Sequence, residues 1–270
     1  MGQPVAGNPT QYMLEKAFLA AGLDWRYLTL EVAPQNLADA IRGMRAMGFR
    51  GGNFTIPHKQ TVIEYLDGLS PAAELMGAVN CVNRVAEQLI GENTDGKGFV
   101  QSLRAVTDPA GKKVVLLGAG GAARAIAVEL GLSGVSDITV VNRGQPRGQA
   151  LVELLNGRLQ LPATLVSLSG DYEVPPDAEI LVNATSIGLG NASARVSVVE
   201  SSLRPELIVA DVIFNPPQTR LIRIAAERGC RTIDGLGMLV NQAAISFNIW
   251  TGLNADSVVM RDALEEFLEI

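Results

Sequence analysis

The stretch VVLLGAGGAARAIAVEL, residues 114–130, decides the fold of this chain. Its first four residues are a short continuous apolar run, which is typical of a strand buried on both faces of a parallel sheet. From Ala122 onward, apolar residues recur every three or four positions, which indicates a helix. A strand, a glycine turn and a helix therefore follow one another, as in a dinucleotide-binding unit.

The turn carries the spacing of a dinucleotide fingerprint. Gly118, Gly120 and Ala123 match the pattern G-x-G-x-x-G/A. The first glycine allows a tight turn, the second lets the backbone approach a pyrophosphate, and the small alanine lets helix and strand pack closely. The helix N-terminus then offers free N–H groups to the anion. No Gly-Lys-Ser/Thr follows, so a nucleoside-triphosphate loop is excluded. The alternative is a tight strand–helix turn without a ligand.

The next expected strand, residues 137–141, indicates which dinucleotide is bound. It ends at Asn142 and Arg143, and Arg147 follows four residues on. An NAD site usually carries Asp or Glu at this position to hold the ribose 2′-OH. Two guanidinium groups instead suit the 2′-phosphate of NADP, because they donate charge-assisted hydrogen bonds. The alternative is that both arginines are ordinary solvated residues at a helix start.

Composition excludes several classes of protein. The net charge of −6 argues against a nucleic-acid or anionic-membrane partner. Two cysteines, Cys81 and Cys230, form no disulfide framework, which fits a reducing cytoplasm. No apolar run reaches membrane-spanning length, and no basic-then-apolar start indicates secretion. With His58 as the single histidine, a zinc-dependent dehydrogenase is disfavoured and no metal site is expected.

The remaining elements indicate two α/β units. In the first unit, strands that alternate with helices predict a mostly parallel sheet. The helices expected there cover residues 12–21, 37–47, 59–66, 72–76 and 95–103. The strands cover residues 26–32, 52–56, 79–85 and 88–91, and the last two are expected to pair like a hairpin. In the second unit, beyond residues 109–111, strands are expected at 114–117, 137–141, 164–167, 179–183, 207–212 and 232–233, and further helices at 148–155 and 221–227. The apolar stripes of the last helices, 237–251 and 257–268, are expected to return to the first unit.

A lysine and an aspartate are the candidates for proton transfer. Lys59 closely follows the strand expected at 52–56, and Asp95 stands at another junction between elements. Parallel sheets place ligands at the carboxyl ends of their strands. An adjacent carboxylate orients a lysine amine, so the two residues suit a proton relay in a cleft. From composition alone, a surface ion pair or two unrelated solvated charges is the competing interpretation.

Five ordered motifs carry a family resemblance. They are NFTIPHK (53–59), GAVN (77–80), NTDG (93–96), NATSIG (183–188) and DGLGMLV through QAA (234–244). With GAGGAARA and the Asn-Arg that follows it, they resemble the shikimate dehydrogenase family over essentially the whole chain. Members of that family reduce 3-dehydroshikimate with NADPH in aromatic amino-acid biosynthesis, using a Lys–Asp dyad and no metal.

The resemblance implies a role for each matching residue. Lys59 would transfer the proton, and Asp95 would be its partner. The residues implied at the substrate are Asn8, Thr10, Asn53, Thr55, Asn80, Phe214 and Gln242. Those implied at NADP are Gly118, Ala119, Gly120, Gly121 and Ala122 at the pyrophosphate, Asn142, Arg143 and Arg147 at the adenosine end, Val212 and Gly235 beside the nicotinamide, and Thr185, which is implied at the cofactor without a particular part of it.

The chain departs from the family pattern in several places. The family usually grips the substrate carboxylate with Ser-x-Ser-Pro, where this chain has Asn8, Thr10 and Gln11. A tyrosine that the family often places before x-Pro is Phe214, and the threonine expected after Asn-Arg is Gly144. The family's opening strand would precede Gly2, so we expect natural residues before Met1.

We therefore predict a cytoplasmic, NADP-dependent shikimate dehydrogenase-type enzyme, monomeric or homodimeric, with an α/β fold. Residues 1–97 would form the α/β domain that binds the substrate, residues 98–236 a Rossmann-type doubly wound domain that binds NADP, and residues 237–270 C-terminal helices that pack on the first domain. One alternative is a family member that acts on quinate or another cyclohexane carboxylate. Another is a non-catalytic regulator that binds NADP or shikimate, although Lys59 and Asp95 argue against it.

Overall fold

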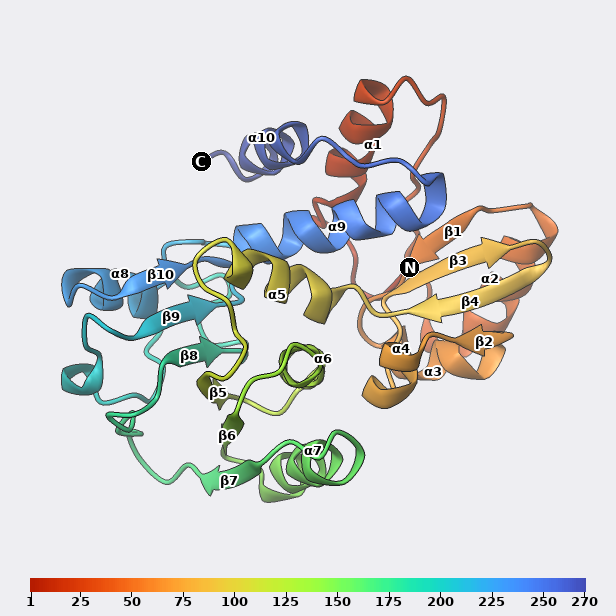
Figure 1. The fold of residues 1–270 in the computed structure, drawn as a ribbon. Helices are drawn as coiled ribbons and strands as arrows, with labels where there is room; N and C mark the ends of the chain where they lie inside the picture. Colours follow the sequence, from red (N-terminus) through yellow and green to blue (C-terminus); the bar gives the residue numbers. More distant parts are fainter. The chain divides into compact units, whose positions relative to one another are not determined.

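The computed structural model describes residues 1–270, which divide into two compact units. Unit 1 comprises Met1–Thr94 and Val240–Ile270, and unit 2 comprises Asp95–Leu239. The predicted α/β class with helices around parallel strands is confirmed, and the last helices return to unit 1 (Figure 1). No helix is both long and apolar enough to cross a bilayer.

Unit 1 surrounds a small sheet. Its helical elements are α1 (Thr10–Ala20), η1 (Pro34–Asn36), α2 (Leu37–Ala46), α3 (His58–Thr61), η2 (Val62–Tyr65), α4 (Pro71–Met76), most of α9 (Gly235–Thr251) and α10 (Ser257–Leu268). Its strands are β1 (Gly51–Asn53), β2 (Gly68–Leu69), β3 (Cys81–Val85) and β4 (Gln88–Glu92). The core holds Leu37, Ile41 and Met44 of α2 together with apolar residues of the sheet, and α10 packs on α1.

The sheet of unit 1 is mainly antiparallel, so the prediction of a mostly parallel sheet is wrong for this unit. The strand order is β1-β3-β4-β2, with antiparallel pairing of β1 with β3 and of β3 with β4. Only β2 and β4 run parallel. The cause is local: β3 and β4 form a hairpin, closed by Ala86 at positive φ, and this hairpin takes the centre of the sheet.

The strand expected at residues 26–32 does not form either. The segment is extended, but only Glu31 makes a bridge, and its partner is Gly2. Thr29 gives its N–H to the Gln11 side chain (3.0 Å) instead of to a neighbouring strand. A strand needs a ladder of backbone partners, and this segment has too few.

Unit 2 is a doubly wound domain. Its strands are β5 (Lys113–Leu117), β6 (Asp137–Asn142), β7 (Ala163–Ser167), β8 (Ile180–Asn183), β9 (Ile208–Asp211) and β10 (Arg231–Ile233), and its helices include α5 (Asp95–Arg104), α6 (Gly121–Leu132), α7 (Gln145–Arg158), η3 (Glu200–Ser202) and α8 (Arg220–Glu227). All neighbouring strands are parallel, in the order β10-β9-β8-β5-β6-β7. The chain moves outward from β5 in one direction and then from β8 in the other. Their boundary is therefore the topological switch point, where such folds bind ligands.

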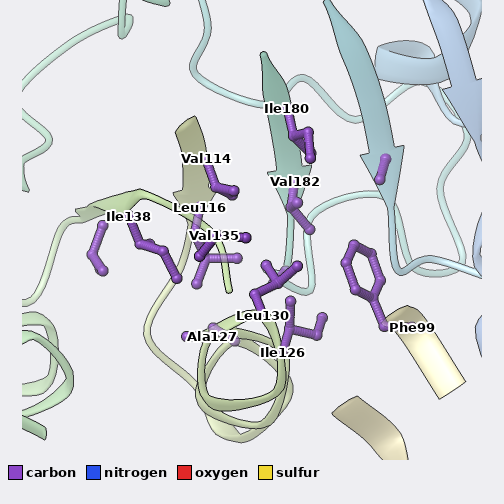
Figure 2. Close-up of a cluster of buried hydrophobic side chains, with 14 of the residues drawn as sticks. Phe99, Val114, Leu116, Ile126, Ala127, Leu130, Val135, Ile138, Ile180 and Val182 are labelled. Carbon is purple, nitrogen blue, oxygen red and sulfur yellow. The ribbon is translucent and has the colours of Figure 1, made fainter. Parts of the chain in front are cut away.

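The apolar run of β5 explains why the sheet is buried. Figure 2 shows Ile126, Ala127 and Leu130 of α6 facing Val114 and Leu116 of β5, all nearly inaccessible to solvent. Burying one such aliphatic side chain stabilises the fold by about 1.5–3 kcal/mol. On the opposite face, side chains of β8, β9 and α8 form a second cluster. Both faces are covered, so the strands read as continuous apolar runs.

Helices α5 and α6 approach each other very closely through a glycine. A Cβ atom on Gly96 would lie 2.3 Å from the carbonyl oxygen of Ala125 and 2.9 Å from the Cβ of Glu129. Only glycine fits against that backbone. The start of α5 is therefore held against the middle of α6.

Candidate functional site

The turn at Gly118 lies at the topological switch point, on the carboxyl edge of the unit 2 sheet. Gly118 has φ +105°, a conformation that favours glycine, and its N–H donates to the Val141 carbonyl (2.8 Å). A Cβ atom there would lie 3.1 Å from the Ala184 carbonyl oxygen. Glycine is needed here because the chain turns tightly after β5 and the turn is packed against the loop that follows β8.

The N-terminus of α6 is open where the fingerprint requires it. Gly120 is the N-cap residue, and no atom lies within 4 Å of a Cβ built on Gly120 or on Gly121. Ala123 is fully buried against the sheet. The first N–H groups of α6 have no intrahelical acceptors, so the residues present fit an anionic pyrophosphate.

The end of β6 offers positive charge without a carboxylate. Arg143 and Arg147 are exposed, and neither forms a hydrogen bond or an ion pair. The Asn142 side chain donates to the Gly144 carbonyl (2.7 Å), which shapes the turn into α7. Two unpaired guanidinium groups beyond a strand next to β5 fit a ribose 2′-phosphate.

The ends of β8 and β9 are joined by a network of side chains. Asn183 Nδ2 donates to Asp211 Oδ1 (2.9 Å), and Asn183 Oδ1 accepts from the N–H (3.2 Å) and hydroxyl (2.7 Å) of Thr185. Val212, which follows β9, donates its N–H to the Asn183 carbonyl (3.0 Å). Gly235 lies against the same loop, because a Cβ there would be 2.5 Å from the Val212 carbonyl oxygen. Thr185, Val212 and Gly235 therefore cluster on one edge of unit 2.

Asp211 is the ionisable group of this edge. Its residue exposure is only 1 %. Burial raises the pKa of its carboxyl to about 6, while hydrogen bonds from Thr219, Ile213 and Asn183 act in the opposite direction. Burial dominates because it removes water from the charged form.

In unit 1, three of the residues predicted at the substrate belong to one buried polar cluster. Asn53 Nδ2 donates to the Asn80 carbonyl (3.1 Å), and Asn80 Nδ2 donates to Thr94 Oγ1 (3.0 Å). The Thr94 hydroxyl reaches Gln242 Oε1 (3.4 Å) and Ser246 Oγ (3.3 Å). This neutral cluster consists of Asn53, Asn80, Thr94, Gln242 and Ser246, and it ties β1, the residue before β3 and α9 together.

Lys59 lies next to the neutral cluster along the backbone. Its carbonyl accepts from the Val79 N–H (2.7 Å), one residue before Asn80. The preceding His58 is buried and its Nε2 contacts the Val32 carbonyl oxygen (2.7 Å), so the lone histidine has a structural role. Asp95 directly follows Thr94 and is the first residue of α5, in unit 2. Its pairing with Lys59 stays a prediction.

The other predicted substrate residues are dispersed. Asn8 Oδ1 accepts from the Thr10 N–H (2.9 Å) at the start of α1, and neither residue is hydrogen-bonded to the neutral cluster. Thr55 is half-buried and lies between β1 and α3, where its N–H donates to the Met1 carbonyl (3.0 Å). Phe214 is half-buried in unit 2, in the loop after β9. Their roles toward a substrate stay predictions.

Sequence reasoning missed three residues that organise these clusters. Thr94 and Ser246 complete the neutral cluster, and Asp211 is the hub of the β8–β9 edge. Ser246 lies four residues after Gln242, so it falls on the same helix face and could have been found by periodicity. Asp211 ends an apolar strand at the carboxyl edge, which is also a usable signal. No group of three or more His, Cys, Asp or Glu side chains is arranged to hold a metal ion.

Comparisons with known proteins agree along the chain. The family model described as "Shikimate dehydrogenase substrate binding domain" matches residues 1–82, "Shikimate / quinate 5-dehydrogenase" matches residues 101–212, and "Shikimate 5'-dehydrogenase C-terminal domain" matches residues 235–265. A protein of Methanopyrus kandleri named shikimate dehydrogenase (NADP(+)) is 41% identical over 274 residues, covering 99% of this chain and 94% of that protein.

Two solved structures add different information. Shikimate 5-dehydrogenase from Thermus thermophilus, in complex with NADP(H) and shikimate, is 35% identical, with a TM-score of 0.86 and coverage of 99% of this chain and 97% of that one. The ligand-free 5-ketofructose reductase of Gluconobacter sp. strain CHM43 is 50% identical, with a TM-score of 0.96 and coverage of 98% and 96%. This chain is therefore similar to proteins named for two different substrates.

Proposed function

The chain belongs to the shikimate dehydrogenase family, and from that premise we propose that it is an NADP-dependent oxidoreductase that interconverts 3-dehydroshikimate and shikimate. The observation that carries the proposal is the carboxyl edge of unit 2, where the Gly118 turn, the open start of α6 and the unpaired arginines suit NADP. NADP would supply or accept the hydride. Every other requirement of the reaction must come from the residues of the chain.

Proton transfer is proposed for Lys59. When the substrate hydroxyl is oxidised to a ketone, its O–H proton must leave as the hydride departs from the same carbon. The neutral amine of Lys59 would accept that proton, and its ammonium form would return the proton to the carbonyl oxygen in the reverse reaction. Asp95 would orient the amine and balance the charge of the ammonium. Thr55, Asn80 and Gln242 would bind the ring substituents.

A keto sugar is a second candidate substrate, favoured by one specific observation. The similarity to the 5-ketofructose reductase, at 50% identity, coincides with changes at the places where the family grips a carboxylate. Asn8 uses its amide oxygen at the start of α1, and Gln11 Oε1 accepts from the Thr29 N–H. Phe214 cannot donate a hydrogen bond. A keto sugar has no carboxylate and needs no such grip. Quinate and related acids need it as much as shikimate does.

A substrate panel decides between these candidates. NADPH oxidation is followed at equal concentrations of 3-dehydroshikimate and 5-ketofructose, and NADP reduction with shikimate and quinate. A higher kcat/KM for 3-dehydroshikimate supports the first proposal, and a higher value for 5-ketofructose replaces it with the second. Turnover of quinate alone would assign the chain to that acid. Binding of NADPH without turnover of any of the four would favour a non-catalytic regulator.

Phe214→Tyr provides an internal check on the substrate. The variant adds one hydroxyl donor with little change in ring volume. If the pocket takes a carboxylate, the KM for shikimate should fall by about tenfold, because hydrogen bonds to charged groups contribute about 1.5–3 kcal/mol. The KM for 5-ketofructose should not improve. An unchanged KM for shikimate would argue that residue 214 does not face a carboxylate.

We also propose that the enzyme works in the cytoplasm as a monomer or homodimer, with small molecules as its only partners. Both cysteines are buried and neither forms a disulfide, which is compatible with a reducing compartment. Light scattering of the eluting protein at several concentrations measures the oligomeric state directly.

A further inference from the structure

Asp211 gathers hydrogen bonds from three separate segments of unit 2. Oδ1 accepts from Asn183 Nδ2 at the end of β8 (2.9 Å) and from the Ile213 N–H in the loop after β9 (3.1 Å). Oδ2 accepts from the hydroxyl of Thr219, the N-cap residue of α8 (2.8 Å). One carboxylate thus joins two neighbouring strand ends to the start of the next helix.

The two side chains that donate to Asp211 each make further hydrogen bonds in their own segments. Asn183 Oδ1 accepts twice from Thr185, and the Thr185 hydroxyl accepts from the Ile187 N–H (3.1 Å), which orders the loop after β8. The Thr219 hydroxyl accepts from the Ile222 N–H (3.3 Å), which caps α8. Movement of the carboxylate would therefore disturb both loops and the helix start.

These two loops border the proposed cofactor site on unit 2. The loop after β8 lies against the Gly118 turn, since a Cβ on Gly118 would be 3.1 Å from the Ala184 carbonyl oxygen and from Thr185 Cγ2. The loop after β9 is backed by Gly235, whose Cβ would lie 2.4 Å from the Ile213 carbonyl carbon. Asp211 lies beneath both loops, nearly inaccessible to solvent, and would not itself touch a ligand.

The chemistry of the site calls for a carboxylate. All three partners donate to the carboxylate, and the Thr219 hydroxyl, which also accepts from the Ile222 N–H, donates to Oδ2. An asparagine has almost the same shape but keeps only one acceptor oxygen, so it cannot accept all three hydrogen bonds in their present arrangement. A carboxylate buried without a cation is unfavourable, so an uncharged residue would serve better if only stability mattered. Burial accordingly raises the pKa of this group.

We propose that Asp211 is a positioning residue for the nicotinamide end of the cofactor, because its carboxylate holds the loops after β8 and β9 in register with the Gly118 turn. This inference rests on the proposed function, in which NADP occupies this edge. It assigns the loops to the nicotinamide half and leaves the adenosine end to Arg143 and Arg147.

Calorimetric titration of the Asp211→Asn variant tests the proposal with two ligands. NADPH carries the nicotinamide, and adenosine 2′,5′-bisphosphate carries only the adenosine end. We expect NADPH to bind about tenfold more weakly than to the wild type, the size of effect of losing one hydrogen bond to a charged group. Adenosine 2′,5′-bisphosphate should bind as before. The matched control is Asp177→Asn, which removes an exposed carboxylate of the same unit that pairs with Lys113.

Stability separates a positioning role from a merely structural one. At pH 8 the urea midpoint of Asp211→Asn should equal or exceed that of the wild type, although NADPH binding is weaker. Unchanged NADPH affinity, equal weakening of both ligands, or a lower midpoint that accompanies weaker binding would each overturn the proposal. If Asp211→Asn does not fold, Thr219→Val removes one donor instead and should weaken NADPH selectively. A wild type that fails to bind NADPH would overturn the proposed function itself.

Discussion

The two units differ in the kind of polar side chain that they bury: uncharged side chains in unit 1 and an ionisable carboxyl group in unit 2. In unit 1, the neutral cluster of Asn53, Asn80, Thr94, Gln242 and Ser246 contains only amides and hydroxyls, and the backbone of Lys59 is bonded to Val79, one residue before Asn80. In unit 2, the loops of the carboxyl edge are held by an ionisable group, Asp211. Because no member of the neutral cluster itself titrates, we expect the effect of a substitution within it to depend little on pH, whereas the effect of replacing Asp211 should depend on pH.

Removing the side chain of Lys59 should have the largest effect. Lys59→Ala should lower kcat by about a hundredfold or more while largely sparing KM, because positioned acid–base groups contribute about 10²–10⁴-fold. Steady-state rates with the preferred substrate of the panel measure this. Lys16→Ala, an exposed lysine of α1 in the same unit, is the control. Near-normal turnover of Lys59→Ala would remove the lysine from the mechanism.

Removing the two outer charges of unit 2 should have the next largest effect. The double variant Arg143→Ala/Arg147→Ala should bind NADPH roughly 30-fold more weakly, about 2 kcal/mol, after allowance for solvent screening. NADH binding should change little, because NADH lacks the 2′-phosphate. Arg158→Ala, at the other end of α7, is the control. Equal weakening of both cofactors would make these arginines structural.

Breaking the neutral cluster should lower stability without a pH signature. Thr94 is fully buried, and Thr94→Val keeps its shape but takes the hydroxyl partner from Asn80 Nδ2. The free energy of unfolding should fall by about 1–3 kcal/mol, the cost of a buried polar group left unsatisfied. Urea denaturation at pH 5.5 and at pH 8 should give the same loss. A loss that differs between the two would mean that a titrating group is coupled to this cluster.

Asp211 should give the smallest effect on stability, and the one that depends on pH. Its folded-state pKa of about 6 lies above the ordinary value of 3.8, so the stability that it contributes is complete below the ordinary value and is lost as pH rises through 6. Between pH 5 and pH 8 the wild type should therefore lose about 1.4 kcal/mol relative to Asp211→Asn. Urea denaturation of both proteins across this range measures the difference. Parallel curves would contradict the burial-driven shift.

Much of unit 2 could be predicted from the sequence because its signals are local. The apolar run of β5, the turn at Gly118 and the helical spacing after Ala122 lie within one short stretch. The parallel order of the sheet follows from the alternation of strands and helices. The ends of its strands then predict which loops share an edge.

Unit 1 was harder because its decisive partners are distant in sequence. The alternation around Tyr27 resembles a strand, but Thr29 bonds to the Gln11 side chain and the ladder never forms. Asn53 is predicted at the substrate, and the sequence alone did not indicate that its amide accepts from the Tyr27 hydroxyl and donates to Asn80 and Ser246. Periodicity reports which face of an element is apolar. It does not predict which side chain, distant in the sequence, forms a hydrogen bond with a given polar group.

The contact between Gly96 and Ala125 has a mechanical meaning for the enzyme. Asp95 begins α5 one residue before this contact, and α6 begins at the Gly118–Gly121 turn. At this contact the backbone of α5 lies directly against the backbone of α6, with no α5 side chain between them. Asp95 and the turn that precedes α6 are therefore attached to two helices in direct backbone contact, and we expect their spacing to be well defined. The exposed residues at the adenosine end can therefore be replaced to change cofactor affinity. Any side chain at position 96 would instead push α5 and α6 apart.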